Sequence, residues 1–352
     1  MSDFSKVFKI IIFEKGHRPK ENLYGILLAA IKNKNVNSVL ISNLFSKSIN
    51  ASNLKIKDIE NLSLQFSRYK KFSFFLNNFL QIYNSKLIFG KFPISLRIIL
   101  ILLNWKGYYI CVPPGKITKA VGFYKSGLIS NFKILKNMIS HNLFRTKVLS
   151  CDELDKIYLS ASHGYPINSL INSRLPKHLW INRQINYEYK ELSQSKILFA
   201  PTERKKGYPS PITKLLEEES FIKAIINKGL QIEYSHHIHD LNKTNKIRKE
   251  VKKFSGNWQG IDILITDYSS IGADFLLSGG KKVIYFTIDK INFIRDYGNG
   301  PLFELEIKNG KECKDKESLL KNIINFKDGS KGRISFKFDK RKFFELIISK
   351  II

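Results

Sequence analysis

Two adjacent serines, Ser269 and Ser270, stand where the chain could bind a phosphate. They follow an apolar run at residues 261–265 that predicts a buried β-strand. From Ile271 onward the apolar spacing is that of a helix, so the serines fall at a strand–helix turn. A helix start presents unpaired N–H groups and a positive dipole end, which favour an anion. The local alternative is that Asp267, Ser269 or Ser270 only caps the helix, and the residues alone leave both open.

Arg204 and a group of histidines follow two further predicted strands. Arg204 lies in a basic loop after a strand at residues 195–200, and the next strand is followed by His236, His237 and His239. The carboxyl ends of parallel strands meet at one edge of a sheet, so we expect these groups to join the two serines. A guanidinium can hold a phosphate through two hydrogen bonds, and a histidine adds a charged donor. The three loops therefore predict a site for a diphosphate-containing ligand, with His236 favoured by its spacing from the strand.

Neither the histidines nor the cysteines predict a metal site. Asp240 is the one carboxylate beside the histidine group, and the chain has no HExxH motif. The cysteines Cys111, Cys151 and Cys313 are odd in number and form no CxxC pair, which argues against zinc and against a disulfide framework. We expect no metal and no cofactor, and the cysteine pattern fits a reducing cytoplasm.

His163 is the candidate general base. Residues 155–160 predict a strand that runs into Ser162, His163 and Gly164. A histidine on a loop at the carboxyl end of a parallel strand lies where α/β proteins bind ligands, and Gly164 lets a substrate approach the backbone. The alternative is a histidine that only supports its loop.

The charge of the chain is strongly positive and unevenly distributed. The 352 residues include 59 Lys and Arg against 30 Asp and Glu, a formal net charge of +29. Residues 1–150 hold 24 basic and 5 acidic residues, and residues 61–150 hold no Asp or Glu. The asymmetry predicts a polyanionic partner: a nucleic acid, an anionic membrane surface or an anionic polymer. A lysine-rich genome would explain the lysines, although not the missing carboxylates.

The predicted elements indicate an α/β protein of two domains. Strands at residues 7–13 and 38–42 flank a helix at 22–33, which indicates a doubly wound domain, and a second such unit begins at residue 195. Further helices are predicted at residues 132–139, 214–227 and 243–254. We place the boundary near Asn186, giving domains 1–186 and 187–352. Basic, aromatic-rich helices at 67–83 and 93–105 suit an interfacial surface or ordinary packing. The N-terminus predicts a first strand and no signal peptide, and no apolar run is long enough to span a bilayer.

Several of these segments resemble one family. The segments ILFAPTER and DILITDYSSIGADFLLSGGKKVIYF, with Asp289 and RDYGNGPLFELE after them, are similar to the CDP-glycerol glycerophosphotransferases of teichoic acid and capsule polymer synthesis. The HGYP segment at His163 is similar to the HGT loop of that family. The likeness covers roughly residues 155–310.

The resemblance implies a fold, a reaction and a site. The fold would be GT-B, with two Rossmann-like domains facing across a cleft. The reaction would transfer glycerol phosphate, or a related alditol phosphate, from a CDP-activated donor to a hydroxyl of a cell-surface polymer or lipid-linked acceptor, releasing CMP. His163 would act as the base. The implied donor-binding residues are Arg204, His236, Asp267, Ser269 and Ser270.

Partners and alternatives follow from the same resemblance and charge. We expect CDP-glycerol or a related cytidine nucleotide as donor, an anionic acceptor, and attachment to the inner face of the cell membrane from the cytoplasm. An alternative is a GT-B glycosyltransferase that uses a CMP-activated or other nucleotide-activated sugar, like a sialyltransferase, in capsule or lipopolysaccharide synthesis. A nucleic-acid-binding protein is the third alternative, and the absence of any known nucleic-acid motif argues against it.

Overall fold

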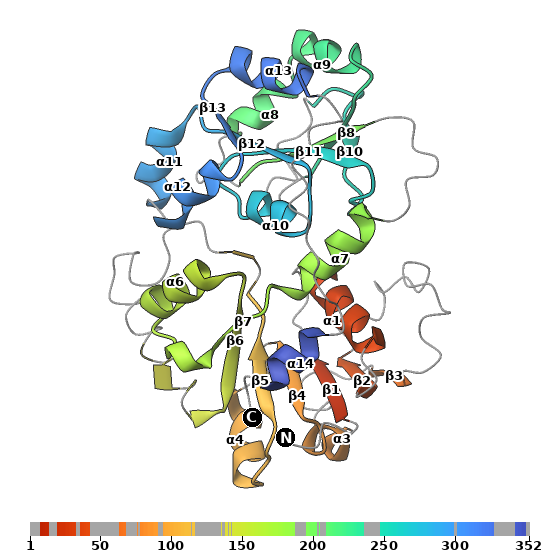
Figure 1. The fold of residues 1–352 in the computed structure, drawn as a ribbon, viewed down its shortest axis with the longest axis vertical. Coiled ribbons are helices and arrows are strands. Elements are labelled where there is room, and N and C mark those ends of the chain that lie inside the picture. Colours follow the sequence, from red (N-terminus) through yellow and green to blue (C-terminus); the bar gives the residue numbers. More distant parts are fainter. Residues whose placement is uncertain are drawn as a thin grey trace. The chain divides into compact units, whose positions relative to one another are not determined.

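The structure is a computed structural model, and all structural statements below concern the residues that it describes (Figure 1). Those residues are 8–13, 20–32, 36–42, 63–67, 76, 78–90, 94–113, 115–116, 135, 138–139, 141, 143–186, 195–202, 204, 209–235, 247–298, 301–326 and 342–349, although a few side chains within them are not described.

The chain folds into two compact units, which are described separately. Unit 1 comprises residues 1–114, 126–180 and 338–352, and unit 2 comprises residues 115–125 and 181–337. The change from unit 1 to unit 2 thus falls within a helix, α7 (Pro176–Ile185). The domain limits 1–186 and 187–352 stay a prediction.

Unit 1 is built on a seven-stranded sheet in which all strands run parallel. The strand order is β3-β2-β1-β4-β5-β6-β7. The chain thus builds outward from β1 in one direction and then outward from β4 in the other. The strands are β1 (Phe8–Phe13), β2 (Val36–Ser42), β3 (Ser63–Ser67), β4 (Leu87–Gly90), β5 (Tyr108–Cys111), β6 (Thr146–Ser150) and β7 (Leu170–Asn172).

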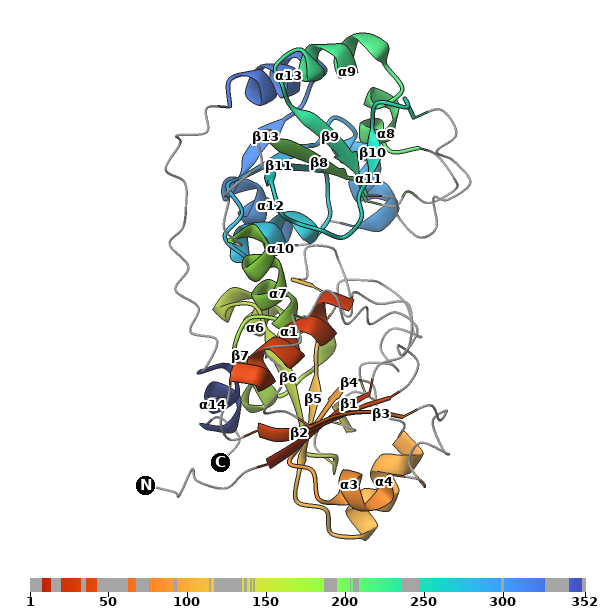
Figure 2. The same cartoon turned by 90° about the vertical axis from the view of Figure 1, so that its right-hand side faces the viewer.

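Helices pack against this sheet because each buries an apolar stripe. In α1, residues Leu23, Leu27 and Ala30 are almost fully buried at helical spacing. α14 comes from the end of the chain and packs beside α1 (Figure 2). The helices of unit 1 are α1 (Lys20–Lys32), α3 (Phe79–Tyr83), α4 (Ile94–Leu102), α6 (Glu153–His163), the 3₁₀ turn η5 (Ile167–Ser169), the first half of α7, and α14 (Lys342–Ser349).

Unit 2 is built on a six-stranded parallel sheet in the order β10-β9-β8-β11-β12-β13. The chain again builds outward from its first strand, β8, and then reverses direction at β11, which pairs with β8 on the other side. The strands are β8 (Lys196–Ala200), β9 (Gln231–Tyr234), β10 (Lys252–Lys253), β11 (Ile261–Thr266), β12 (Lys282–Phe286) and β13 (Lys311–Cys313).

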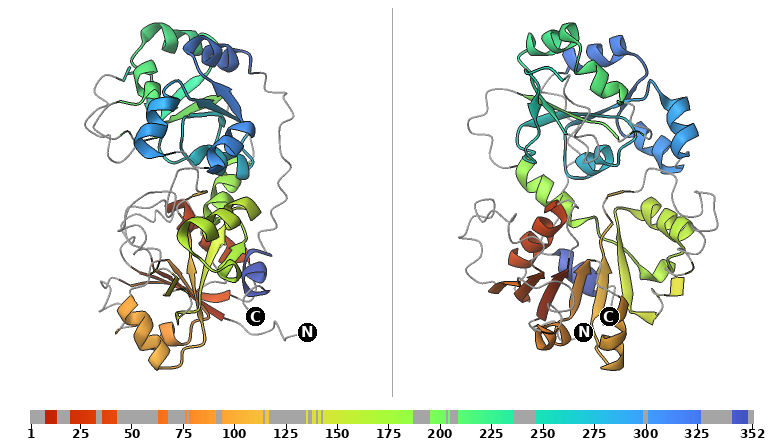
Figure 3. Two further views of the ribbon diagram at one scale, coloured as in Figure 1. Left: turned by 90° about the vertical axis from the view of Figure 1, so that its left-hand side faces the viewer. Right: turned by 180° about the vertical axis from the view of Figure 1, so that it is seen from behind.

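Alternating side chains of these strands fill two cores, one on each face. In β11, Ile263 and Ile265 belong to one core, and Leu264 belongs to the other. Helices therefore cover both faces of the sheet (Figure 3), which explains why β11 is buried at every residue. The helices are α8 (Pro211–Leu215), α9 (Glu219–Ile226), α10 (Ile271–Leu277), α11 (Lys290–Tyr297), α12 (Pro301–Lys308) and α13 (Lys316–Ile324).

The parallel sheets confirm the predicted α/β class, whereas several local predictions were wrong. Residues 155–160 form part of helix α6, because Asp152 caps the helix by accepting from the N–H of Asp155 at 2.8 Å and Gly164 ends it with φ 68°. The helix predicted at 214–227 is two helices, α8 and α9. The predicted helix at 243–254 is not helical in its described part, 247–254.

The sheet of unit 1 also contains strands that the sequence interpretation missed. Residues 63–67 and 87–90 form β3 and β4, and residues 146–150 form β6. The predicted helix at 67–83 is helical at Leu76 and in α3, while residues 68–75 lie outside the described part. The predicted helix at 132–139 also falls largely outside the described residues.

Candidate functional site at the carboxyl edge of the second sheet

The strand order of unit 2 reverses between β8 and β11, and open parallel sheets have their ligand crevice at the carboxyl ends of such a pair of strands. The crossover connections leave β8 in one direction and β11 in the other, so the loops that follow these two strands separate. Ligands of open parallel sheets bind at such a point. Thr202 and Arg204 follow β8, residues 267–270 follow β11, and Asp289 follows the neighbouring strand β12. The predicted groups Arg204, Asp267 and the two serines therefore meet at this edge.

Arg204 is the centre of a network of hydrogen bonds at this edge. Its Nη2 donates to Asp267 Oδ2 at 2.8 Å and to Asp289 Oδ1 at 3.2 Å, and its Nε donates to Asp289 Oδ2 at 3.0 Å. Its Nη1 donates to the carbonyl oxygen of Thr202 at 2.9 Å. The side chain is 8% exposed. Arg204 thus uses most of its donors within the protein, so it positions two carboxylates more than it offers a free clamp for phosphate.

Asp267 is a buried junction between the loops after β8 and β11. Its Oδ1 accepts from the backbone N–H groups of Thr202 at 2.8 Å and of Tyr268 at 2.6 Å. Its Oδ2 accepts from Ser210 Oγ at 3.2 Å in addition to Arg204. Its side chain is 1% exposed. Asp267 therefore holds the two loops together. We predicted Asp267 as a donor-binding residue, and these contacts indicate that it positions the loops.

The two carboxylates decide the charge state of Arg204. Burial by itself would lower the pKa of the guanidinium, but Asp267 and Asp289 outweigh burial and raise the pKa above its usual value. Arg204 therefore stays charged well above neutral pH. Asp289 is the more accessible of the two carboxylates, with 19% of its side chain exposed.

Tyr268 supports the network from the apolar side. Its hydroxyl donates to Asp289 Oδ1 at 3.0 Å, and its ring stacks on Phe293 of α11 with centroids 3.8 Å apart. The guanidinium carbon of Arg204 lies 5.2 Å from the Tyr268 centroid and 5.1 Å from that of Phe293. Burial, then the charge of Asp289, raises the pKa of Tyr268, so its hydroxyl keeps its proton and remains a donor.

The two serines differ in how they are used. Ser269 Oγ accepts from the N–H of Ile271 at 3.3 Å, which caps the first turn of α10. Ser270 makes no capping hydrogen bond with its side chain. Both are half-buried, so their hydroxyl groups can reach solvent or a ligand. The capping interpretation is therefore correct for Ser269, and Ser270 keeps a donor for another partner.

Thr202 is a site residue that the sequence interpretation missed. It is 4% exposed, and its hydroxyl oxygen has no hydrogen-bond partner among the described residues. A buried hydroxyl without a partner is unfavourable, which marks a place where a ligand or water atom would be stabilised. Asp289 and Tyr268 were missed as members of the network. Their sequence signal is their place directly after β12 and β11.

His236, His237 and His239 lie outside the described residues, as do the residues around them up to 246. The described chain before them ends with strand β9, which pairs with β8, and Ser235. Their contact with a ligand stays a prediction.

His163 ends a helix and does not follow a strand. It is the last residue of α6, which begins next to the carboxyl end of β6, where Asn172 Nδ2 donates to Glu153 Oε1 at 3.1 Å. The eleven residues of α6 span about 16 Å from that point to His163. His163 Nδ1 lies 2.7 Å from Ser162 Oγ, and its ring stacks on Tyr165. Burial lowers its pKa. The predicted strand-end position of His163 was wrong.

His163 belongs to a stack of three aromatic rings. The ring of Tyr165 lies between His163 and His141, with centroids 5.5 Å and 4.3 Å away. His141 interacts with the backbone of Thr146, the first residue of β6. Burial, aided by the charge of Arg97, lowers the pKa of His141 to about 4. The stack is therefore neutral near pH 7.

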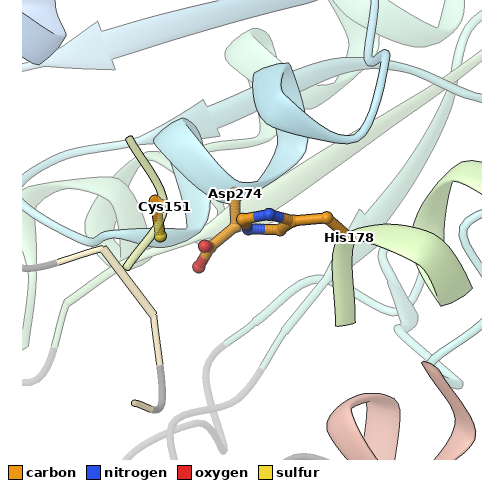
Figure 4. Close-up of side chains that lie close together, drawn as sticks. All are labelled: Cys151, His178 and Asp274. Atoms are coloured by element: carbon orange, nitrogen blue, oxygen red, sulfur yellow. The ribbon is translucent and has the colours of Figure 1, made fainter. Parts of the chain in front are cut away.

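Within one unit of the described chain, Cys151 and His178 are the possible metal ligands that lie close together. The Cys151 Sγ and a ring nitrogen of His178 lie within 4.8 Å of each other in unit 1. Figure 4 also draws Asp274, which belongs to unit 2. His178 Nδ1 already accepts from the N–H of Leu175 at 3.3 Å. Two ligands, one with a committed ring nitrogen, fall short of the four of a structural zinc site.

The sequence matches a known family over most of its length. The match to the family described as CDP-Glycerol:Poly(glycerophosphate) glycerophosphotransferase covers residues 129–346. A curated relative, the teichoic acid poly(glycerol phosphate) polymerase of Bacillus spizizenii, is 26% identical over 220 residues. That match takes in 55% of this chain and half of the length of the polymerase.

Solved structures of similar fold include a wall teichoic acid polymerase and an epimerase. The match to a structure of the wall teichoic acid polymerase TagF covers 99% of this chain and 85% of the TagF chain, with a TM-score of 0.63 and 12% identity. The match to the UDP-GlcNAc 2-epimerase of Neisseria meningitidis covers 97% of this chain and 99% of the epimerase chain, with a TM-score of 0.52 and 10% identity. These likenesses concern the fold. The family match over residues 129–346 shows that the chain belongs to the CDP-glycerol:poly(glycerophosphate) glycerophosphotransferases.

Proposed function

We propose that this protein transfers glycerol phosphate from CDP-glycerol to a hydroxyl group of a cell-surface polymer and releases CMP. The observation that carries the proposal is the family match, which includes the whole carboxyl edge of the sheet of unit 2. The name of the Bacillus spizizenii relative agrees with it. The crevice between β8 and β11 supplies hydroxyl donors on loops that are held in fixed positions, which suits the phosphoryl oxygens of a diphosphate.

The reaction is a displacement at the β-phosphorus of the donor. The acceptor oxygen forms a bond to this phosphorus and gives up its proton, while the bond to the bridging oxygen breaks and CMP leaves with the electron pair. Such reactions depend on positioned donors, because charge spreads over the phosphoryl oxygens. Ser270 and Thr202 would donate to these oxygens. Arg204, Asp267 and Asp289 would hold the loops that carry them.

We infer that the two units act as the halves of a GT-B enzyme, with the donor on unit 2 and the acceptor facing it from unit 1. The likeness of the fold to TagF over 99% of the chain supports this arrangement. The acceptor would be an anionic polymer or a lipid-linked chain, and its charge matches the basic unit 1. The same charge supports attachment to the inner face of the cell membrane. No described helix has the length and apolar character needed to cross a bilayer.

His163 gives a sharp prediction for the chemical step. His163 ends a helix and does not follow a strand, so its role as the general base rests on the resemblance of HGYP to the HGT loop of the family. As the general base, His163→Ala should lower transfer by about 100-fold or more with donor binding unchanged, while the free energy of unfolding falls by about 1–2 kcal/mol through the lost stack on Tyr165. Steady-state CMP release, donor titration and urea unfolding measure these effects. Transfer that stays within about threefold of the wild type would exclude His163 as the base.

The alternative of a transferase for CMP-activated sugars is not favoured by the family match. Calorimetric titration of the protein with CDP-glycerol, CDP-ribitol, CMP-sialic acid and UDP-GlcNAc separates the alternatives without an acceptor. CDP-glycerol is expected to bind at least about tenfold more tightly than UDP-GlcNAc, which corresponds to about 1.4 kcal/mol. Preferential binding of CMP-sialic acid would overturn the proposal in favour of a sugar transferase.

A further inference from the structure

Ser162 is a polar side chain on the buried face of α6. The buried residues of this helix include Tyr158, Leu159 and Ser162, which recur at helical spacing and share one face. Ser162 is 0% exposed. A hydroxyl group that is buried beside apolar side chains is unfavourable unless a hydrogen bond satisfies it. Ser162 therefore depends on a partner inside the protein.

The partner of Ser162 is the imidazole ring of His163. Ser162 Oγ lies 2.7 Å from His163 Nδ1, and the Ser162 side chain makes no other hydrogen bond to a described residue. At this distance the hydroxyl group can be the donor or the acceptor, depending on which ring nitrogen carries the proton. Nδ1 is therefore the ring nitrogen of His163 that the protein binds.

The second ring nitrogen of His163 is available to a substrate. Nε2 makes no hydrogen bond to a described residue, and it is not one of the buried polar atoms that lack a partner. The residue is half-buried, and its ring stacks on Tyr165 with an interplanar angle of 17°. A hydroxyl group can therefore approach Nε2, while Nδ1 and the stacked face of the ring are held.

The turn after α6 holds Tyr165 in its place beside His163. The N–H of Gly164 donates to the carbonyl oxygen of Ser160 at 3.0 Å, and Ser160 Oγ donates to the carbonyl oxygen of Tyr165 at 2.8 Å. The φ of 68° at Gly164 is one that residues with a Cβ rarely adopt. His141 stacks on the Tyr165 ring as well. The plane of the His163 ring thus has a fixed neighbour.

The tautomer of His163 decides which ring nitrogen can accept a proton. A neutral imidazole carries one N–H, and its other nitrogen has the lone pair that accepts. With the proton on Nδ1, the N–H donates to Ser162 Oγ, and the lone pair is on the accessible Nε2. With the proton on Nε2, the lone pair is on Nδ1, where the Ser162 hydroxyl donates to it. The first tautomer alone lets Nε2 act as a base.

We propose that Ser162 is a positioning residue whose oxygen accepts a hydrogen bond from Nδ1–H of His163, which keeps the lone pair on Nε2 for the proton of the acceptor hydroxyl. In the transfer, the acceptor oxygen forms its bond to the β-phosphorus, its proton moves to Nε2, and CMP leaves with the electron pair of the broken bond. The resulting imidazolium carries a proton on both nitrogens, and Ser162 Oγ still accepts from Nδ1–H. A base that a third group orients is a recurring catalytic arrangement.

The groups around His163 keep its ring neutral, as a base requires. Burial lowers the pKa of His163. Burial, aided by Cys111, raises the pKa of Tyr165, and burial, aided by Arg97, lowers the pKa of His141 to about 4. A neutral hydroxyl beside Nδ1 adds no negative charge that would raise the pKa of the ring. Transfer should therefore fall only as the pH drops through the lowered pKa of His163, where the ring gains its second proton.

The tautomer can be measured directly in protein that contains isotope-labelled histidine. The nitrogen chemical shifts of the two ring atoms differ between the tautomers, and the signals that His163→Ala removes identify His163. At a pH well above the pKa of the ring, we expect the proton on Nδ1 in the wild type and a smaller share of this tautomer in Ser162→Ala. A proton on Nε2 in the wild type, or a tautomer that Ser162→Ala does not change, would overturn the inference.

Turnover separates the proposed role of Ser162 from a merely structural one. Ser162→Ala should lower kcat about tenfold, which is the kinetic equivalent of one hydrogen bond, with the KM for CDP-glycerol unchanged. Ser162→Thr keeps the hydroxyl and should recover most of the loss. Wild-type kcat in Ser162→Ala, or a raised KM in place of a lowered kcat, would contradict the role. If Ser162→Thr does not fold, the tautomer in Ser162→Ala still decides.

Ser150→Ala is the matched control for these variants. Ser150 is also 0% exposed and lies in unit 1, and its Oγ donates to the carbonyl oxygen of Ile171 at 3.2 Å. Its loss should lower the free energy of unfolding about as much as Ser162→Ala does, while kcat and the His163 tautomer stay as in the wild type. A fall in kcat of the same size in both variants would assign the effect of Ser162 to stability.

This inference rests on the proposed function, because a base is needed where a hydroxyl attacks, but the two can fail separately. The tautomer is measured without donor or acceptor, and the donor titration needs no base. A protein that transfers glycerol phosphate while His163 keeps its tautomer in Ser162→Ala would retain the proposed function and lose this role of Ser162. A protein that releases no CMP from CDP-glycerol would overturn the proposed function whatever the tautomer, and the role of Ser162 with it.

Discussion

Arg204→Gln is expected to destabilise unit 2 by about 3–5 kcal/mol and to abolish donor binding, because a buried carboxylate that loses its partner is far less stable than a pair or than no charge at all. The substitution removes the cation that pairs with both Asp267 and Asp289, and Asp267 is only 1% exposed. The loops after β8 and β11 would then lose their common anchor. Hydrogen exchange at the amides of β8 and β11 reports the effect for this unit alone.

A control and a double variant make this prediction specific. Arg295→Gln removes an arginine of α11 whose side chain is 72% exposed, and it should change the free energy of unfolding by less than about 0.5 kcal/mol. Adding Asp267→Asn to Arg204→Gln should recover part of the lost stability, because the buried negative charge is gone. If Arg204→Gln unfolds like Arg295→Gln, the network does not hold this edge of the sheet together.

Replacing Ser269 and Ser270 with alanine is expected to weaken CDP-glycerol binding by about tenfold to 100-fold. A hydrogen bond to a charged group contributes about 1.5–3 kcal/mol, which matches this range for the loss of one donor. The fold should remain, since both side chains are half-buried and outside the cores. Calorimetric titration of the double variant measures the effect.

The single variants separate capping from binding. Ser269→Ala should lower the free energy of unfolding by about 0.5–2 kcal/mol, because its hydroxyl caps α10. Ser270→Ala should leave the free energy of unfolding unchanged, because the Ser270 hydroxyl caps no helix, and it should weaken the binding of CDP-glycerol. Ser318→Ala on α13 is the control, as another serine at a helix start. Unchanged donor affinity in both variants would reduce the turn to a helix cap.

The sequence predicted the elements of unit 2 better than those of unit 1 for a physical reason. Strands β8, β11 and β12 are buried on both faces, so they stand out as short apolar runs next to Gly or polar loops. The segment at 155–160 was misleading because Tyr158 and Leu159 are buried, while Leu154 and Ile157 are exposed apolar residues. Apolar residues on both faces of a helix imitate a strand, and the cap at Asp152 was the signal that was overlooked.

The sequence predicted where the candidate site lies, and it did not predict the hydrogen bonds within it. Residues after parallel strands must meet at one edge, which brought Arg204, Asp267 and the serines together correctly. The sequence could not show that Arg204 donates to Asp267 and Asp289, which lie 63 and 85 residues away along the chain. Such partners depend on how the loops close over the sheet. For the same reason, nothing in the sequence marked the hydroxyl of Thr202, which has no partner among the described residues.

The most direct test of the central claim is CMP release by the purified protein in the presence of a glycerol phosphate polymer on a membrane-lipid anchor. With CDP-glycerol as the donor, we expect one CMP for each glycerol phosphate added to the polymer, and little CMP from CMP-sialic acid. The Ser269 and Ser270 double variant should show a higher KM for the donor. CMP formed from CMP-sialic acid but not from CDP-glycerol would contradict the assigned reaction.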